Sequence, residues 1–221
     1  MLTLVSLPLG PRDEPSKLAA ETLRSADLIL GESFKEAYRI LSPLGLRDKP
    51  VELINEHSKA EDLQSHLLKC RELNVALISD NGTPGFCDPG NDLIGLCRGE
   101  GIAVKTVVGP SSLMGLLALA SEKLREFLFK GFLPRETGER QQEWQRMAAT
   151  TVPLVIMDTP YRLRKTLEEM SLVLPKHRAL IVCNLTSEEE WNFEGRASEI
   201  LKALPFAKAE FLILIYPLKA P

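Results

Sequence analysis

SDNGTPGFCDPG, residues Ser79–Gly90, holds three glycines, two prolines and two aspartates within twelve positions. It follows Val75–Ser79 (VALIS), an apolar run without polar alternation that indicates a strand covered on both faces. It precedes Asp92–Arg98, where apolar residues recur at helical spacing. A simple strand-to-helix connection needs only a few turn residues. The excess of turn-forming residues therefore indicates a loop with a role beyond connecting two elements.

The same alternation extends to both sides of this loop. Runs of strand length are Leu2–Leu7, Asp27–Gly31, Val75–Ser79 and Ile102–Val108. Stretches of helical period lie between or after them, at Leu18–Ala26, Glu61–Arg71, Asp92–Arg98 and Ser111–Ala120. A β-α-β-α order predicts an α/β fold with a mainly parallel sheet flanked by helices.

The second half of the chain has a different pattern of apolar and charged residues. Its expected strands are Phe127–Phe132, Leu154–Met157, Ala179–Cys183 and Phe211–Tyr216. A charged segment, Arg135–Arg146, predicts an exposed turn and helix, and Leu163, Leu167, Met170 and Leu174 predict another helix. The apolar helix gives way to charge near Ser121–Glu126. We therefore expect two α/β domains, residues 1–121 and 122–221.

Composition excludes several classes of protein. The 221 residues carry 27 Lys and Arg against 30 Asp and Glu, a net charge of −3, which excludes a uniformly basic nucleic-acid-coating protein but not a local basic groove. No apolar run approaches the roughly 18–20 residues that cross a bilayer, and the N-terminus does not read as a signal peptide. The four cysteines are scattered without a C-x-x-C pair, so we expect a reduced, cytoplasmic protein without a metal site.

Missing motifs narrow the enzyme classes further. The chain has no G-x-x-x-x-G-K-[ST], which argues against a P-loop nucleotide hydrolase. It has no G-x-G-x-x-G after the first strand, which argues against a dinucleotide-binding domain and the commonest class of methyltransferase. H-E-x-x-H and G-x-S-x-G are also absent.

Three turns follow three of the expected parallel strands: Leu7–Pro11, Ser79–Gly90 and Gly109–Ser112. Because ligands bind beyond the carboxyl ends of parallel strands, these turns predict one shared site. Asn81-Gly82 and Pro84-Gly85 let a ligand approach the main chain closely. The alternative is local: Asp88 would cap the next helix with Pro89 in its first turn, and Ser111 or Ser112 would cap the helix after it.

SDNGTPGFCDPG, VVGPSSL (residues 107–113) and FLFKGFLPR (residues 127–135), in this order and spacing, resemble the tetrapyrrole methylase superfamily, and most closely its ribosomal RNA small subunit methyltransferase I branch. The resemblance implies S-adenosylmethionine as cofactor, bound in a cleft between two α/β domains without the usual Gly-rich loop. Matching motif by motif, it implies a cofactor lined by Pro8, Leu9, Gly10, Asn81, Gly82, Thr83, Phe86, Ser111, Ser112, Met157, Asp158, Asn184 and Leu185. Met157 as a core residue and Phe86 as a plug beneath its loop are the alternatives.

The substrate half of the family pattern is less well kept. The E-D-T-R of the RNA-methylating branch reads Glu32-Ser33-Phe34-Lys35, and its E-S-P-H-R reads Asp158–Arg162 with Tyr161 in place of His. Cys183–Glu190 lacks the branch's Arg, Lys and His. By this matching, Glu32, Tyr161 and Arg162 are the candidate substrate-binding residues.

The predicted function is methyl transfer from S-adenosylmethionine to RNA, by resemblance to a ribose hydroxyl of small-subunit rRNA. Methylation of a tetrapyrrole or other small acceptor, and cofactor binding without catalysis, are the alternatives. Asp80, Asp158 and Glu32 are candidate bases, with turn or cap roles as the alternative, so no catalytic residue is assigned. The resemblance also implies a homodimer.

Positive charge gathers in one part of the second half. Its members are Arg135, Arg140, Arg146, Arg162, Arg164 and Lys165. They predict an RNA-binding surface, and the alternative is a solvated helix face balanced by Glu136, Glu139, Glu143, Glu168 and Glu169.

Overall fold

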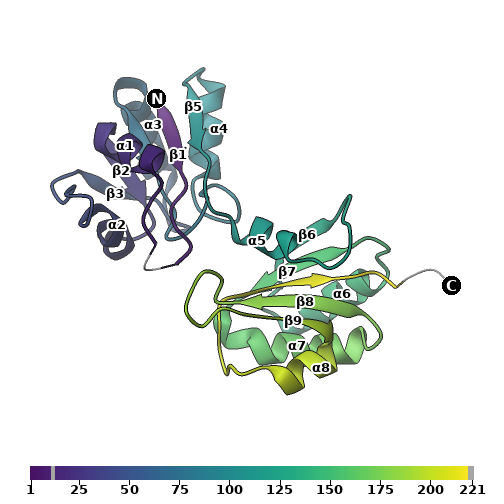
Figure 1. The fold of residues 1–221 in the computed structure, drawn as a ribbon. Coiled ribbons are helices and arrows are strands. Elements are labelled where there is room, and N and C mark those ends of the chain that lie inside the picture. Colours follow the sequence, from purple (N-terminus) through teal and green to yellow (C-terminus); the bar gives the residue numbers. More distant parts are fainter. Residues whose placement is uncertain (11–12, 219–221) are drawn as a thin grey trace. The chain divides into compact units, whose positions relative to one another are not determined.

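The first five strands form one fully parallel sheet (Figure 1). They are β1 (Leu2–Val5), β2 (Leu28–Gly31), β3 (Val51–Leu53), β4 (Val75–Leu77) and β5 (Val104–Val107), in the order β3-β2-β4-β1-β5. The computed structural model describes residues 1–10 and 13–218, and Pro11 lies outside them. The predicted parallel sheet is confirmed.

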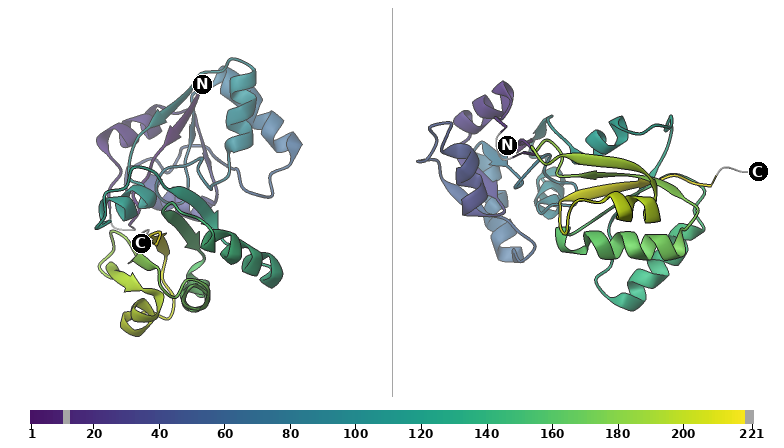
Figure 2. Two further views of the ribbon diagram at one scale, coloured as in Figure 1. Left: turned by 90° about the vertical axis from the view of Figure 1, so that its right-hand side faces the viewer. Right: turned by 60° about the horizontal axis from the view of Figure 1, so that its bottom comes forward.

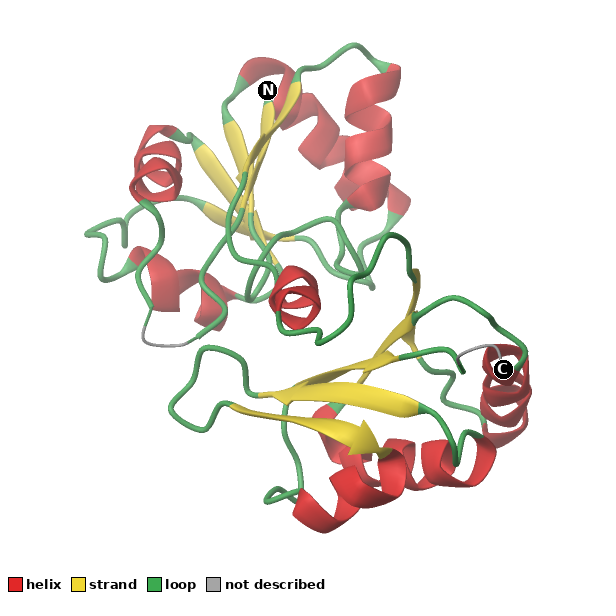
Figure 3. Ribbon diagram, turned by 45° about the vertical axis from the view of Figure 1, so that its right-hand side comes forward, coloured by secondary structure: helices red, strands yellow, loops and turns green. Residues whose placement is uncertain are grey.

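Helices cover both faces of this sheet (Figure 3). Helices α1 (Lys17–Ser25) and α2 (Phe34–Leu41) bury Leu23 and Ile40 against Val5 and Ile29. Helices α3 (Ala60–Glu72) and α4 (Asn91–Gly99) pack on the other face, with Leu67 and Leu93 against Leu30 and Leu77. The neighbouring strands β1 and β4 therefore lead into helices on opposite faces. This is the topological switch point at which open α/β sheets bind ligands.

Three details of the first sheet and its helices differ from the sequence prediction. Helix α2 was not expected, although Phe34, Ala37, Ile40 and Leu41 have helical spacing and Ser33 caps the helix by accepting a hydrogen bond from the Glu36 N–H. Strand β3 was not expected either, because it has only three residues and none of them is fully buried.

The third difference is the start of α4. The helix begins at Asn91 with Gly90 as its N-cap, so Asp88 does not cap it. Gly90 has a φ of 116°, and a Cβ there would lie 2.7 Å from Leu77 Cδ2. The loop therefore extends two residues further than an Asp88 cap would allow, and glycine is required where it passes Leu77.

The second sheet is mixed, in the order β6-β7-β10-β8-β9 (Figure 1). Its strands are β6 (Leu128–Phe132), β7 (Leu154–Asp158), β8 (Arg178–Cys183), β9 (Trp191–Arg196) and β10 (Phe211–Ile215). β6 and β7 are parallel, and β10 runs antiparallel to its neighbours β7 and β8. β9 was not expected, because only Gly195 of its six residues is buried.

One face of this sheet carries three helices, α6 (Thr137–Ala148), α7 (Leu163–Val173) and α8 (Ala197–Ala203), as Figure 2 shows for α7. A short 3-10 turn, η1 (Pro160–Arg162), leads into α7. The predicted positions Leu163, Leu167, Met170 and Leu174 are all buried in this core. In the part of the chain that the structure describes, no helix is long and apolar enough to cross a membrane.

Helix α5 (Ser112–Ala118) covers the opposite face of the second sheet. Leu116 is fully buried with Val155 and Val182, and a Cβ on Gly115 would lie 2.7 Å from Leu185 Cδ2. The structure accordingly divides into Met1–Ser111 and Ser112–Pro221. The expected boundary at residue 121 differs by one helix, because the apolar residues of α5 pack on the second sheet.

Candidate functional site

The loops after β1 and β4 are joined through their main chains. We define the first loop as residues 6–10, the second as residues 79–90 and the third as residues 108–111. The Leu7 N–H donates to the Gly82 carbonyl at 2.7 Å, and the Gly82 N–H donates to the Pro8 carbonyl at 3.3 Å. Gly82 has a φ of 72°, and a Cβ there would lie 3.0 Å from Leu9 Cδ2. Glycine is therefore required where the two loops cross.

Side-chain hydroxyls connect the third loop to the other two. The Ser6 hydroxyl donates to Thr83 Oγ1 at 3.0 Å, and the Thr83 hydroxyl donates to the Pro110 carbonyl at 3.0 Å. Gly109 passes so close to the first loop that a Cβ would lie 2.6 Å from Ser6 Cβ. The three loops thus meet, as their positions at the strand ends predicted. Sequence reasoning missed Ser6, although a serine at the end of an apolar strand was a visible signal.

The predicted cofactor residues of the three loops differ in whether they join the loops or are exposed on them. The polar groups of Gly82 and Thr83 hold the loops together. Pro8 and Gly10 are buried, and Leu9 and Ser111 are half-buried. Asn81 and Phe86 are exposed. That these residues contact a cofactor stays a prediction.

Three carboxylates gather beside the second loop, where the adjacent strands β2 and β4 end. The Asp80 N–H donates to Glu32 Oε1 at 3.4 Å. Burial, then the charges of Asp88 and Asp80, raise the pKa of Glu32 to about 7. Burial and the charge of Asp80 raise the pKa of Asp88 to about 6. Burial, then the charge of Glu36, also raises the pKa of Asp80 above its ordinary value. In this acidic cluster, Glu32, Asp80 and Asp88, burial therefore favours the protonated form of each carboxyl group.

The site residues predicted in the second half lie along one edge of the second sheet. Phe211 of β10 pairs in register with Asp158 on one side and with Cys183 on the other, so β7 and β8 end at the same edge. Asn184 follows there with a φ of 49°, and its Oδ1 accepts from the Glu210 N–H at 3.2 Å. Met157 and Leu185 pack with the core under α5.

Asp158 does not fit a role as a base or as a side-chain ligand. It is 3% exposed, and Oδ2 accepts from Arg140 Nη1 at 2.7 Å and from the Thr166 hydroxyl at 3.1 Å. Its Oδ1 accepts from the Thr159 N–H at 2.8 Å and from Arg162 Nη1 at 3.4 Å. Both oxygens are occupied by partners within the fold, so this carboxylate is structural.

The expected basic surface is also smaller than its sequence suggested. Arg140 is 1% exposed and pairs with Asp158 and Glu169, so its inclusion among RNA-binding residues was wrong. Arg162 pairs with Asp158, Arg146 with Glu143, and Lys165 with Glu169. Arg135 and Arg164 are exposed. Four of the six positive side chains therefore pair with carboxylates. Glu143 and Glu169 belong to the glutamates of the alternative interpretation, but Arg140 is buried and does not lie on a solvated face.

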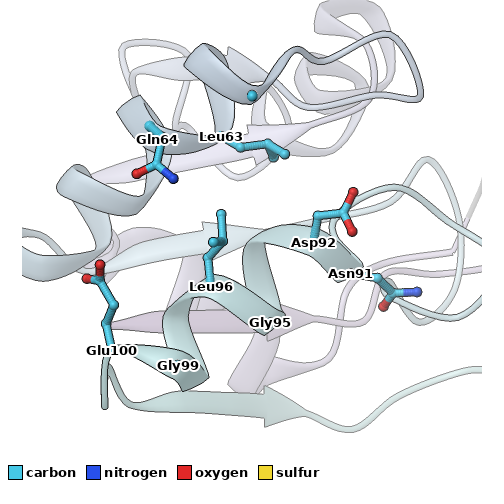
Figure 4. Close-up of a pocket in the computed structure, with 9 residues that line it drawn as sticks. Leu63, Gln64, Asn91, Asp92, Gly95, Leu96, Gly99 and Glu100 are labelled. Atoms are coloured by element: carbon cyan, nitrogen blue, oxygen red, sulfur yellow. The ribbon is translucent and has the colours of Figure 1, made fainter.

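A groove of about 580 Å³ lies between α3 and α4 (Figure 4). Leu63 of α3 and Leu96 of α4 lie between the two helices, and Gly95 and Gly99 leave space along α4. None of the predicted cofactor residues lines it. Within residues 1–10 and 13–218, no group of three or more His, Cys, Asp or Glu side chains is arranged to hold a metal ion.

Comparison with known proteins gives consistent matches. The family model described as Tetrapyrrole (Corrin/Porphyrin) Methylases matches residues 1–201. Ribosomal RNA small subunit methyltransferase I of Neisseria meningitidis serogroup B is 31% identical, over 98% of this chain and 76% of that protein. The protein of the same name from Coprothermobacter proteolyticus is 32% identical, over 98% of each chain.

Solved structures agree at the level of fold. Diphthine synthase superposes with a TM-score of 0.72 at 14% identity, covering 98% of this chain and 89% of that one. Uroporphyrin-III C-methyl transferase from Thermus thermophilus, complexed with S-adenyl homocysteine, gives a TM-score of 0.64 at 18% identity, covering 97% and 96%. At these identities the likeness shows the fold alone.

Proposed function

Because the chain belongs to the tetrapyrrole methylase family, whose enzymes take a methyl group from S-adenosylmethionine, we propose that it methylates small-subunit ribosomal RNA at a ribose hydroxyl. The convergence of the three loops at the switch point between β1 and β4 is the observation that carries the proposal. The relatives of this chain named as rRNA methyltransferases support the choice of acceptor.

The residues of the first unit fit the cofactor. Asn81 presents an exposed amide within the second loop, whose neighbouring residues Gly82 and Thr83 are hydrogen-bonded to the other two loops. Carboxylates of the acidic cluster supply hydrogen-bond acceptors for amino or hydroxyl groups. The residues of this unit that would hold the cofactor are Pro8, Leu9, Gly10, Asn81, Gly82, Thr83, Phe86 and Ser111. Contributions from Ser112, Met157, Asn184 and Leu185 of the second unit stay predictions.

When bound, the cofactor supplies a methyl group on a positively charged sulfur. In-line displacement requires the acceptor oxygen at about 3–3.5 Å from that carbon. The positive charge fades in the transition state, so neutral peptide groups near the sulfur favour the reaction more than a fixed anion does. The first and third loops provide such neutral surroundings.

The acceptor hydroxyl must lose a proton. Glu32 is suited to take it, because its pKa of about 7 lets the carboxylate both accept and release a proton near neutral pH. Asp158 is excluded by its ion pairs. Tyr161 is 80% exposed, and together with Arg162 it stays a candidate for substrate binding. The homodimer and the cytoplasmic location also stay predictions.

Two assays test the proposal. Calorimetry with S-adenosylhomocysteine measures cofactor binding by the wild-type protein and by Asn81→Ala. Transfer of a tritiated methyl group is then followed on free small-subunit rRNA, on the assembled small subunit and on a tetrapyrrole. Labelling of rRNA that is lost in Asn81→Ala is expected. Binding without any labelled RNA would contradict the acceptor, and labelling of the tetrapyrrole would favour the small-acceptor alternative.

A further inference from the structure

We propose that Arg39 is a positioning residue that fixes the amide of Asn81 with its N–H groups turned toward the ligand. The inference rests on the proposed function, because it concerns how the second loop recognises the cofactor. Arg39 belongs to α2 and follows β2, so it approaches the loop from a different element. Neither the strand pattern nor the loop motif pointed to it.

The contact is made by one nitrogen of the guanidinium group. Arg39 Nη2 donates to the Asp80 carbonyl at 3.0 Å and to Asn81 Oδ1 at 3.1 Å. An arginine side chain has donors only, so the oxygen of the Asn81 amide must face it and the Nδ2 group must point elsewhere. The orientation of the amide thus follows from the chemistry of its partner.

Arg39 is itself held in place on α2. Its Nε donates to Glu36 Oε2 at 2.6 Å, and both side chains are about one-quarter exposed. The hydrogen bond from Arg39 is the main cause that lowers the pKa of Glu36, so this pair stays ionised at neutral pH. A guanidinium that is fixed by one carboxylate loses little further freedom when it binds the loop.

The neighbouring residues of the second loop are fixed from the other side. Gly82 bonds to Leu7 and Pro8 of the first loop, and Thr83 bonds to Ser6 and Pro110. Asn81 therefore lies between two sets of hydrogen bonds, one from Arg39 of α2 and one that joins Gly82 and Thr83 to the other two loops. Its side chain remains exposed. An exposed amide in so constrained a backbone is suited to ligand recognition.

The orientation selects the chemistry of the ligand group at this position. Because Oδ1 of Asn81 accepts from Arg39, the amide presents its N–H groups to the ligand and its oxygen faces away. The ligand must present an acceptor there, such as a carboxylate oxygen, a hydroxyl oxygen or a ring nitrogen. Without Arg39 the amide can rotate and present its oxygen instead, which repels such an acceptor.

S-Adenosylhomocysteine binding measured by calorimetry tests this role, with unfolding midpoints recorded in parallel. Arg39→Met is expected to weaken binding about tenfold, since a hydrogen bond to a charged group and the amide orientation are lost together. Asn81→Asp keeps an oxygen for Arg39 and removes the donor. It is expected to weaken binding by a similar factor without lowering the unfolding midpoint.

A double variant separates positioning from general support of the loop. If Arg39 acts through Asn81, then Arg39→Met combined with Asn81→Ala binds no more weakly than Asn81→Ala alone. Fully additive losses, or wild-type affinity in Arg39→Met or Asn81→Asp, would overturn the inference. Arg47→Met is the matched control, because Arg47 is exposed and bonds only to Ser42 Oγ among the contacts described for it. Absence of binding by the wild-type protein would instead refute the proposed function.

Discussion

The hydroxyl of Ser6 lies 3.0 Å from Oγ1 of Thr83, although 77 positions separate the two residues in the chain. The Thr83 hydroxyl donates its own hydrogen bond to the Pro110 carbonyl, so one threonine joins three loops. Ser6 is only 2% exposed, which leaves water little access to replace a lost partner. The position of the second loop therefore depends on this hydroxyl.

Thr83→Val should lower the free energy of unfolding of the protein by about 1–2 kcal/mol, because the buried Ser6 hydroxyl and the Pro110 carbonyl lose their partner. Urea unfolding measures the change. Thr22→Val is the matched control, because the Thr22 hydroxyl bonds within its own helix to the Leu18 carbonyl. Equal losses in both variants would mean that the loop contact has no special importance.

Gly109→Ala should destabilise the protein by about 1–3 kcal/mol, because the added Cβ would lie 2.6 Å from Ser6 Cβ and the loops would have to separate. Binding of S-adenosylhomocysteine should weaken with it. Gly95→Ala is the control: nothing lies within 4 Å of an added Cβ, and alanine should stabilise α4 by about 0.5–1 kcal/mol. Thermal unfolding and calorimetry check both changes, and a stable Gly109→Ala variant would show that the loops do not approach so closely.

Glu32→Gln should change how stability depends on pH. The pKa of Glu32 rises from 4.5 to about 7 in the folded protein, chiefly through burial and then through Asp88 and Asp80. The folded state thus holds the proton more tightly than the unfolded state. Ionisation of Glu32 therefore costs stability progressively as the pH rises between these two values, and the cost is complete above the higher one.

Because glutamine cannot ionise, the variant should match the wild type at about pH 4 and exceed its unfolding free energy by on the order of 1–2 kcal/mol at about pH 8. Urea titrations at several pH values test this, with Glu21→Gln on α1 as an exposed control. A difference that is constant across the pH range would contradict the raised pKa of Glu32.

Arg140→Met should destabilise the second unit by about 3–5 kcal/mol, because it leaves the buried Asp158 carboxylate without its main cation. Fluorescence of Trp144, which is buried and donates to Glu169 at 2.9 Å, reports the loss during unfolding. Arg146→Met removes an exposed cation from Glu143, which keeps Lys130 as its partner, and should cost at most about 0.5 kcal/mol. A change below about 1 kcal/mol in Arg140→Met would argue that Asp158 finds other compensation.

Several features of the protein follow from local sequence alone. The uninterrupted apolar runs specified buried parallel strands, and the turn-forming residues marked where those strands end. Because parallel strands end at one edge of a sheet, the meeting of the Pro8, Gly82 and Pro110 loops followed without any knowledge of side-chain contacts. The family motifs then supplied the chemistry of the cofactor.

The division into two units and the roles of the charged residues depended on packing. Helix α5 is apolar enough to pack on either sheet, and only the fit of Gly115 against Leu185 and of Leu116 among the second-sheet residues decides between them. Arg140 looked like a surface charge among glutamates. Its three side-chain partners, Asp158, Thr166 and Glu169, come from a strand and a helix 18 to 29 positions away.

Arg39 shows the same limit at the candidate site. A sequence records that an arginine follows a strand on an amphipathic helix, and it does not record which carbonyl and amide that arginine reaches 41 and 42 positions later. The path of the main chain through a strand follows from the preferences of neighbouring residues, so local sequence is enough to predict it. A hydrogen bond between side chains requires two separate elements to lie within about 3 Å of each other, and only the packed tertiary structure fixes that distance.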